Sequence, residues 1–161
     1  MSLNIRPVSD DDLQPLIQMA WLAFEPIFRS FRQVMGDEVF AVVYPDWKKT
    51  QQEAVEGFCK PHENMTAYVA DLDGALAGFV VLVLKPAEKI GEVEFLMVHP
   101  DHQKQGVAAA LNTFALQQLK ASGMEVAVVG TGGDPGHAAA RRSYEKAGYT
   151  PFPQVWYFQK L

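Results

Sequence analysis

The stretch EVEFLMVHPDHQKQGVAAAL, residues 92–111, decides the fold of this chain. Three of its apolar residues alternate with the two-residue period of a β-strand: Val93, Phe95 and Met97. Pro100 ends this strand, because it has no N–H group and restricts the residue before it. The alanine- and leucine-rich segment that follows predicts a helix that opens at about Gln103 and runs to about Lys120.

The start of this predicted helix is a candidate site for a phosphate group. A helix N-terminus leaves several backbone N–H groups without partners inside the helix, and the helix dipole adds partial positive charge there. Together these features bind phosphate or pyrophosphate. We therefore expect the turn from Gln103 to Ala108 to hold a phosphorylated cofactor, and the preceding strand to carry the chemistry.

The length and composition of the chain fit one globular domain. Its 161 residues are enough for one core, so we assign residues 1–161 to a single domain. The net charge of −5 and the scattered basic residues argue against nucleic-acid binding. No apolar run approaches the roughly 20 residues that cross a membrane, and residues 1–12 carry no signal-peptide pattern. Because Cys59 is the only cysteine, we expect a cytoplasmic protein.

The N-terminal half predicts a strand, then helices, then two more strands. The expected elements are a strand at residues 4–8, a helix from Leu13 to about Phe24 or Phe28, a helix at residues 47–60, and strands at residues 66–70 and 75–84. Pro26 is expected to kink or end the first helix. Gly78 inside a strand indicates a bulge or the close approach of another segment. The aromatic residues between Trp21 and Trp47 are either core residues or the lining of an acceptor pocket.

The C-terminal half alternates strands and helices. After the long helix we expect a buried strand at residues 125–129, a glycine-rich connection at 130–136, a helix at 137–147, and two terminal strands at Tyr149–Thr150 and residues 155–158. A strand–helix–strand unit in the middle implies one parallel pair inside the sheet. The predicted fold class is therefore α/β (α+β), with a central mixed, mostly antiparallel β-sheet flanked by helices.

Two motifs in this order resemble those of the GNAT superfamily of acyl-CoA-dependent N-acetyltransferases. The first is Val98-His99-Pro100 followed by Gln103-x-x-Gly106-x-Ala108, which is similar to the family's strand end and Gly-x-Gly/Ala turn. The second is SYEKAGY at residues 143–149, which looks like the family's Tyr-Glu-Lys-x-Gly-Phe. The order of the expected elements agrees with the family fold over nearly the whole chain.

The resemblance implies acetyl-CoA as the acyl donor and assigns residues to it. The implied cofactor-binding residues are Met97, Val98, Gln103, Lys104, Gln105, Gly106, Val107, Ala108 and His137. The main chain of Val98 would pair with the pantetheine arm like an added strand. Gln105 stands where many members carry Arg or Gly, and His137 stands where many carry an asparagine. His137 either replaces that asparagine as a hydrogen-bonding group or helps to start its helix.

Acetyl transfer to an amine also needs an acid and a base. The resemblance implies Tyr144 as the general acid, since a phenol is protonated at neutral pH and can donate to the departing thiolate. Glu92 and Glu94 lie two apart on the expected strand and should point to the same side. They either take the proton of the amine or are solvent-facing charges. His99 and His102 lack further ligands at a recognisable spacing, so no metal site is expected.

The leading hypothesis is an N-acetyltransferase that moves an acetyl group from acetyl-CoA to a primary amine of a small molecule or peptide, by direct transfer in a ternary complex. The alternative is a non-catalytic acyl-CoA-binding sensor or interaction module. The acceptor itself is not encoded in the shared motifs. Trp156 and Phe158 could lie in a homodimer interface.

Overall fold

Five strands form one mixed sheet in the order β1-β2-β3-β4-β5. The computed structural model describes residues 2–161, so the predicted domain begins one residue outside the described part. The elements are β1 (Leu3–Pro7), α1 (Leu13–Met35), α2 (Asp37–Val43), α3 (Trp47–Phe58), β2 (Met65–Leu72), β3 (Ala75–Lys85), β4 (Ile90–Val98), α4 (Val107–Ala121), β5 (Val126–Val129) and α5 (Ala138–Lys146). The first four strands pair antiparallel, and β5 runs parallel to β4. The predicted fold class is confirmed.

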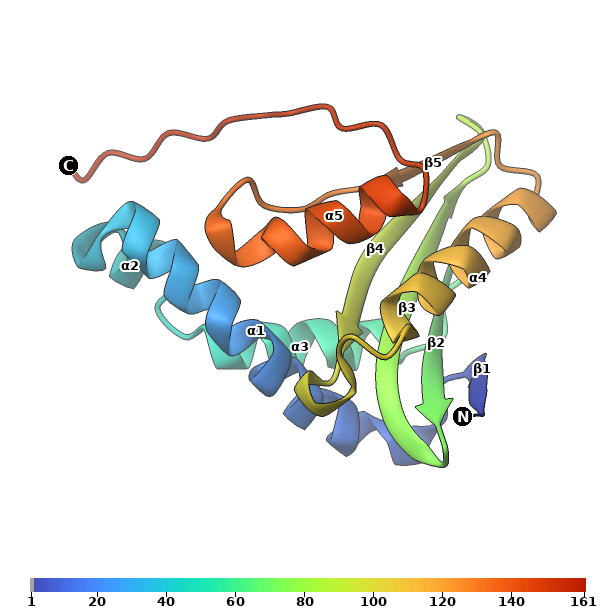
Figure 1. Ribbon diagram of the computed structural model, residues 1–161. Helices are drawn as coiled ribbons and strands as arrows, with labels where there is room; N and C mark the ends of the chain where they lie inside the picture. Colours follow the sequence, from blue (N-terminus) through green and yellow to red (C-terminus); the bar gives the residue numbers. More distant parts are fainter. Residues whose placement is uncertain (1) are drawn as a thin grey trace.

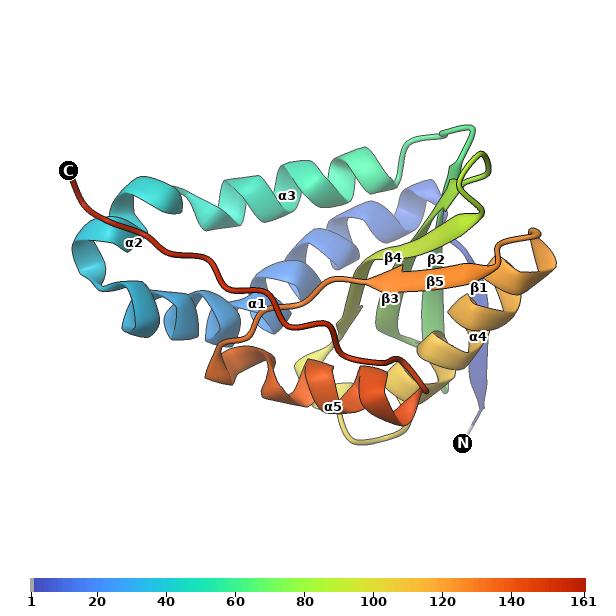
Figure 2. The ribbon, with the colours of Figure 1, turned by 90° about the horizontal axis from the view of Figure 1, so that it is seen from above.

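Helices cover both faces of this sheet. In Figure 2, α1 and α3 lie on one side of the strands, and α4 and α5 lie on the other. β3 is buried on both faces, because Phe79 and Val81 pack beneath α1 and α3 while Val80 and Leu82 pack beneath α4. Strands buried on both faces read as continuous apolar runs, and residues 79–84 are such a run.

Gly78 is a point of close approach between α4 and the sheet. A Cβ atom at this position would lie 2.8 Å from Leu111 Cδ1 and 2.9 Å from Val107 Cγ1, both on α4. Both readings left open from the sequence therefore hold. Ala70 pairs with Gly78 and Asp71 with Leu76, so Ala77, directly beside Gly78, is an extra residue on β3. Gly78 thus lets the first turn of α4 sit directly on β3.

Two helices differ from their predicted limits. α1 continues through Pro26 to Met35. A proline inside a helix costs one backbone hydrogen bond, but the long apolar face of α1 is buried against the sheet and keeps the helix continuous. α4 begins at Val107 rather than at Gln103. Lys104 (φ 60°) and Gly106 (φ 84°) adopt left-handed backbone conformations, which cannot belong to a right-handed helix.

The C-terminal part of the chain departs most from its prediction. β5 was expected to be buried, but it is the edge strand of the sheet, and Val126 and Val128 are 54% and 40% exposed. The two predicted terminal strands are not formed: residues 149–161 have no regular secondary structure and run as an extended segment toward α2 (Figures 1 and 2). Pro151 and Pro153 remove two backbone donors from this segment, which weakens any strand there.

None of the helices within residues 2–161 combines the length and the apolar character that a membrane crossing requires.

Candidate active site between diverging strands

A cleft of about 510 Å³ opens where β4 and β5 separate. β5 pairs with β4 only over Ile90–Val93, whereas β4 continues to Val98. The backbone of β4 beyond Val93 therefore presents N–H and C=O groups to the cleft on the side that β5 has left. Side chains from α1, β4, the turn before α4, the first residues of α4, and α5 line the rest of the cleft.

An irregularity in β4 accompanies this separation. Val93 faces Leu82 of β3 and Phe95 faces Val81, so Glu94 is an extra residue without a partner on β3. The bulge also reverses the alternation of side chains, since Val93 packs beneath α4 whereas Phe95 and Met97 pack beneath α1 and α3. The simple alternation that gave Glu92 and Glu94 one common side therefore does not hold through this segment.

The two strand glutamates lie in different surroundings. Lys85 Nζ donates to Glu92 Oε2 at 2.6 Å, so Glu92 already has a cationic partner. Glu94 lines the cleft. Burial raises the pKa of the Glu94 carboxyl, and the nearby charge of Glu92 raises it further. Of the two, Glu94 is the carboxylate within reach of a molecule in the cleft.

The turn between β4 and α4 closes one end of the cleft. Gln103, Lys104, Gly106 and Ala108 line it, as expected for residues that hold a ligand. Two other predicted cofactor residues have structural side chains: Gln105 Nε2 donates to the carbonyl of Asp101 at 2.9 Å, and Val107 is buried. Gly106 has a φ of 84°, which is unstrained for glycine and turns the chain into the first turn of α4.

Tyr144 lines the opposite wall of the cleft from α5. Burial raises the pKa of its phenol to about 12, with a smaller contribution from Tyr149, whose ring meets that of Tyr144 edge-on at 5.9 Å. The phenol therefore keeps its proton at all physiological pH values. Ser143, the residue before it, accepts a hydrogen bond from Asn112 Nδ2 of α4 at 3.1 Å, which ties α5 to α4.

A buried polar cluster stands at the start of α5, and we call Ser30, Asp134 and His137 the Ser–Asp–His cluster. Ser30 Oγ donates to Asp134 Oδ2 at 2.6 Å, and His137 Nδ1 lies 2.5 Å from Asp134 Oδ1. The Asp134 side chain is 7% exposed and that of His137 is 15% exposed. His137 lines the cleft, whereas the backbone N–H of Gly136 closes the cluster by donating to both Ser30 and Asp134.

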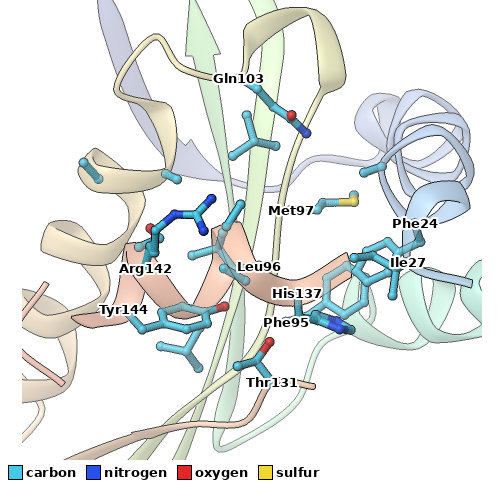
Figure 3. A pocket seen from close by; sticks show the side chains of 18 of the residues that line it. Phe24, Ile27, Phe95, Leu96, Met97, Gln103, Thr131, His137, Arg142 and Tyr144 are labelled. Carbon is cyan, nitrogen blue, oxygen red and sulfur yellow. The ribbon is translucent and has the colours of Figure 1, made fainter. Parts of the chain in front are cut away.

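Several residues of the cleft were missed from the sequence. They are Ile27 of α1, Leu96 of β4, Thr131 after β5, and Arg142 of α5 (Figure 3). Ile27 lies three residues after Phe24, an aromatic residue already considered as a pocket lining, and on the same face of a helix, which is its only sequence signal. No sequence pattern pointed to Arg142, because α5 lines the cleft only as a result of the separation of β5 from β4.

Comparison with known proteins identifies the family. The sequence profile of the Acetyltransferase (GNAT) family matches residues 21–149. The chain belongs to the GNAT acetyltransferase family. The match confirms the predicted family of this GNAT protein.

The curated relatives match only part of this GNAT protein. A mycothiol acetyltransferase of Streptomyces coelicolor is 34% identical over 82 residues, which are 51% of this chain and 26% of that protein. The chain thus spans about a quarter of the length of the curated relatives it matches.

Solved structures of similar size share the fold. The PaiA N-acetyltransferase of Thermoplasma acidophilum, in complex with coenzyme A, has a TM-score of 0.73 and 19% identity, covering 93% of this chain and 91% of that chain. A ribosomal-protein-alanine N-acetyltransferase of Brucella melitensis has a TM-score of 0.67 and 17% identity, covering 99% and 100%. At these identities, the likeness concerns the fold.

Proposed function

We propose that this GNAT protein moves an acetyl group from acetyl-CoA directly to a primary amine of a small molecule or peptide. One observation carries the proposal: the open edge of β4, the turn before α4 and the phenol of Tyr144 all border one cleft. Acetyl-CoA is a linear molecule in which the phosphates, the amide-bearing arm and the sulfur follow one another. These three parts could lie along the turn, the edge of β4 and the phenol of Tyr144, in that order. An amine that enters beside it would meet the thioester carbonyl.

The donor would be held mostly by main-chain groups. The free N–H and C=O groups of β4 up to Val98 can pair with the two amides of the pantetheine arm, in the way that a peptide adds to a sheet edge. The backbone donors from Gln103 to Ala108 are suited to the pyrophosphate, because they lie at the start of a helix of 15 residues. Val98 would then lie beside the part of the arm next to the pyrophosphate, and the acetyl end would reach back along β4 toward Glu94.

Proton transfers would accompany the chemical step. The amine nitrogen attacks the carbonyl carbon, the C–S bond breaks, and the electron pair leaves on sulfur. Tyr144 is proposed to give its proton to this thiolate. Glu94 is a candidate for taking the proton of the ammonium group because it lines the cleft. Glu92 is a weaker candidate because Lys85 already neutralises it.

Direct transfer is favoured over an acyl-enzyme. Cys59, the only cysteine, packs against the core cluster beneath α1 and α3. Burial raises the pKa of its thiol to about 11, with a small contribution from Asp12, so little of it is the reactive thiolate at neutral pH. A ternary complex of donor and amine needs no such nucleophile.

The acceptor would enter from the side of α1, where the aromatic segment lies. Phe28 stacks on Trp47 at 4.6 Å and Phe31 stacks on Tyr44 at 5.4 Å, so these rings hold one another. Phe24 reaches the cleft itself. The aromatic segment therefore serves partly as core and partly as the wall beside which an amine would sit.

The test is the release of free coenzyme A from acetyl-CoA with a panel of amines: aminoglycosides, polyamines, amino acids, peptide N-termini, and the amine precursor of mycothiol. Release that depends on the amine, with an acetylated product by mass spectrometry, would support the proposal. Tight binding of acetyl-CoA without turnover on any amine would favour the alternative, an acyl-CoA sensor. No residue of the cleft favours the sensor, and Tyr144 in the cleft favours the enzyme.

Two further proposals concern the state of the protein in the cell. The extended C-terminal segment exposes apolar side chains that suit a contact between two copies: Phe152, Val155, Trp156 and Tyr157. We propose a homodimer, and sedimentation that gives a monomer at micromolar concentration would contradict it.

A cytoplasmic location is proposed from the single cysteine, and fractionation of the expressing cell would check it.

A further inference from the structure

The Ser–Asp–His cluster is built more elaborately than a helix start requires. A Cβ atom on Gly132 would lie 2.3 Å from Asp134 Oδ1 and 2.5 Å from His137 Nδ1. One on Gly136 would lie 2.7 Å from Ser30 Cβ. Glycine at both positions therefore allows the loop to fold tightly around Asp134 and His137.

Arg141 fixes the same loop from the other side. Its Nη1 donates to the carbonyl of Gly132 at 2.6 Å and to that of Asp134 at 2.7 Å. Together with the hydrogen bonds from Ser30 and Gly136, these bonds hold Asp134 by both its main chain and its side chain. The carboxylate is thus fixed in one orientation toward the imidazole.

The contacts of Asp134 define the state of the histidine ring. Burial by itself would raise the pKa of Asp134, but the hydrogen bonds from Ser30 and His137 outweigh it and lower the pKa. The carboxylate is therefore ionised and can only accept, so Nδ1 of His137 carries the hydrogen of their 2.5 Å contact. When the ring is neutral, the lone pair is then on Nε2, which is the arrangement of a histidine base oriented by a carboxylate.

The position of the ring connects the donor cleft with the aromatic segment. His137 lines the cleft (Figure 3). Its ring lies 5.4 Å from that of Phe31, which stacks on Tyr44. His137 directly precedes α5, and Tyr144 lies seven residues later within it, a separation of roughly 10 Å along the helix axis. A reacting centre between them could touch both side chains.

The charged and titratable groups around His137 come from three elements. Asp134 and Arg141 belong to its own loop and helix, and Tyr44 approaches from the segment after α2. The charge of Asp134 adds to burial in raising the pKa of the Tyr44 phenol, so Tyr44 stays neutral. Ser30 of α1 is the uncharged partner. Asp134 therefore supplies the negative charge in direct contact with the ring.

We propose that His137, positioned by Asp134 and Ser30, is the general base that takes the proton of the acceptor ammonium group. The Nε2 lone pair binds this proton and frees the amine pair, which forms the C–N bond as the C–S bond breaks. The nitrogen loses a second proton when the amide forms, and the sulfur gains one proton from Tyr144, so these two transfers balance. His137 then releases its proton to water. This inference rests on the proposed acetyl transfer.

The rival base is Glu94, and the two carry different support. Glu94 is an exposed residue on a bulge, and no hydrogen bond within the described residues fixes the direction of its carboxylate. His137 has a buried carboxylate fixed behind it and a free nitrogen on the cleft. A base needs a fixed direction toward the proton that it takes. Geometry therefore favours His137.

The experiment compares His137→Gln, Asp134→Asn and Glu94→Gln with the wild-type protein, using an amine that the wild type acetylates. His62→Gln, in an exposed loop, is the matched control and should keep the wild-type rate. We expect His137→Gln to lower kcat about 10²–10⁴-fold at pH 7. The Kd for acetyl-CoA should stay within about threefold of wild type, and the loss should shrink as the pH approaches the pKa of the amine.

Asp134→Asn tests the positioning role. It should lower kcat with the same pH dependence, and a melting temperature near that of wild type would show that the fold is retained. If Asp134→Asn does not fold, Ser30→Ala supplies the second positioning variant. A smaller loss in His137→Gln than in Glu94→Gln, or a raised Kd for acetyl-CoA with unchanged kcat in His137→Gln, would overturn the inference alone. Absence of turnover by the wild type on every amine would overturn the proposed function as well.

Discussion

Asn112 of α4 donates a hydrogen bond of 3.1 Å to the hydroxyl of Ser143 on α5. Asn112 is fully buried, and its neighbours on α4 pack on β3. The turn that leads into α4 lines one end of the cleft, while Ser143 directly precedes Tyr144. One helix therefore fixes the position of both the turn that is proposed to hold the phosphates and the proposed acid.

Removal of this bond should disturb stability and catalysis together. We expect Asn112→Ala to lower the free energy of unfolding by about 1–3 kcal/mol, because it leaves a cavity and an unpaired hydroxyl. Ser143→Ala should cost about 1 kcal/mol. Urea unfolding measures both, and Thr113→Ala, on the exposed face of α4, is the control. A stability of Asn112→Ala equal to that of Thr113→Ala would contradict the prediction.

Tyr144→Phe should separate catalysis from binding. The phenol has a pKa of about 12, so it remains protonated far above neutral pH and its loss removes a proton donor. We expect kcat to fall about 10²-fold with little change in the Kd for acetyl-CoA. Steady-state kinetics and calorimetric titration give the two values. Tyr68→Phe, on β2 and outside the cleft, should keep the wild-type kcat; an unchanged kcat in Tyr144→Phe would exclude the acid role.

Arg142 is predicted to contribute the cation that the turn lacks at Gln105. It lines the cleft from α5, whereas Gln105 binds the carbonyl of Asp101. Arg142→Gln should raise the Kd for acetyl-CoA about tenfold or more, as expected for a hydrogen bond to a charged group, and make binding less sensitive to salt. The Kd for S-acetylpantetheine, which has no pyrophosphate, should not change. Arg29→Gln, on the exposed face of α1, is the control, and an equal loss for both ligands would refute the prediction.

Asp12 should make the fold sensitive to acid. Hydrogen bonds from Arg6 at 2.8 and 2.9 Å lower the pKa of Asp12 to about 2, against the opposing effect of burial. A lowered folded pKa means that the ion pair stabilises the fold above the unfolded pKa of about 3.9 and that this stability is lost as the pH falls toward 2. We expect Asp12→Asn to cost about 1–3 kcal/mol at pH 7 and to flatten the decline of stability between pH 4 and pH 2.

Thermal unfolding over this pH range would check the prediction, with Asp11→Asn as the control. Asp11 is the exposed neighbour of Asp12 in the short 3-10 helix Asp10–Asp12, so its substitution should leave the slope unchanged. Parallel slopes for wild type and Asp12→Asn would mean that another carboxylate is responsible.

The fold could be predicted largely from the sequence, because strand and helix patterns depend on residues that are neighbours in the chain. The alternation before Pro100 and the small residues after it placed β4 and α4, and the two motifs led to the family. The limits of α4 were shifted by Lys104, whose left-handed conformation has no signature in its residue type. The terminal strands were predicted from alternation alone, but a strand forms only where a neighbouring strand accepts its hydrogen bonds.

The site was less predictable for the same reason. Tyr144 and the turn lie in motifs, so the sequence was enough to single them out. The bulge at Glu94 depends on how β4 pairs with β3, and this pairing changes which way each glutamate points. The contact between Ser30 and Asp134 joins residues 104 positions apart. No pattern within a short window could bring these two residues together.

The free edge of β4 bears on how this protein could change over evolutionary time. Peptide N–H and C=O groups are the same for every residue except proline, so mutation of the side chains from 94 to 98 leaves the pairing groups of the donor site in place. Selection for binding of the thioester arm would then constrain the backbone conformation of this segment more than the identity of its residues. New acceptors could be acquired by drift in α1 and the C-terminal segment, at no cost to the donor.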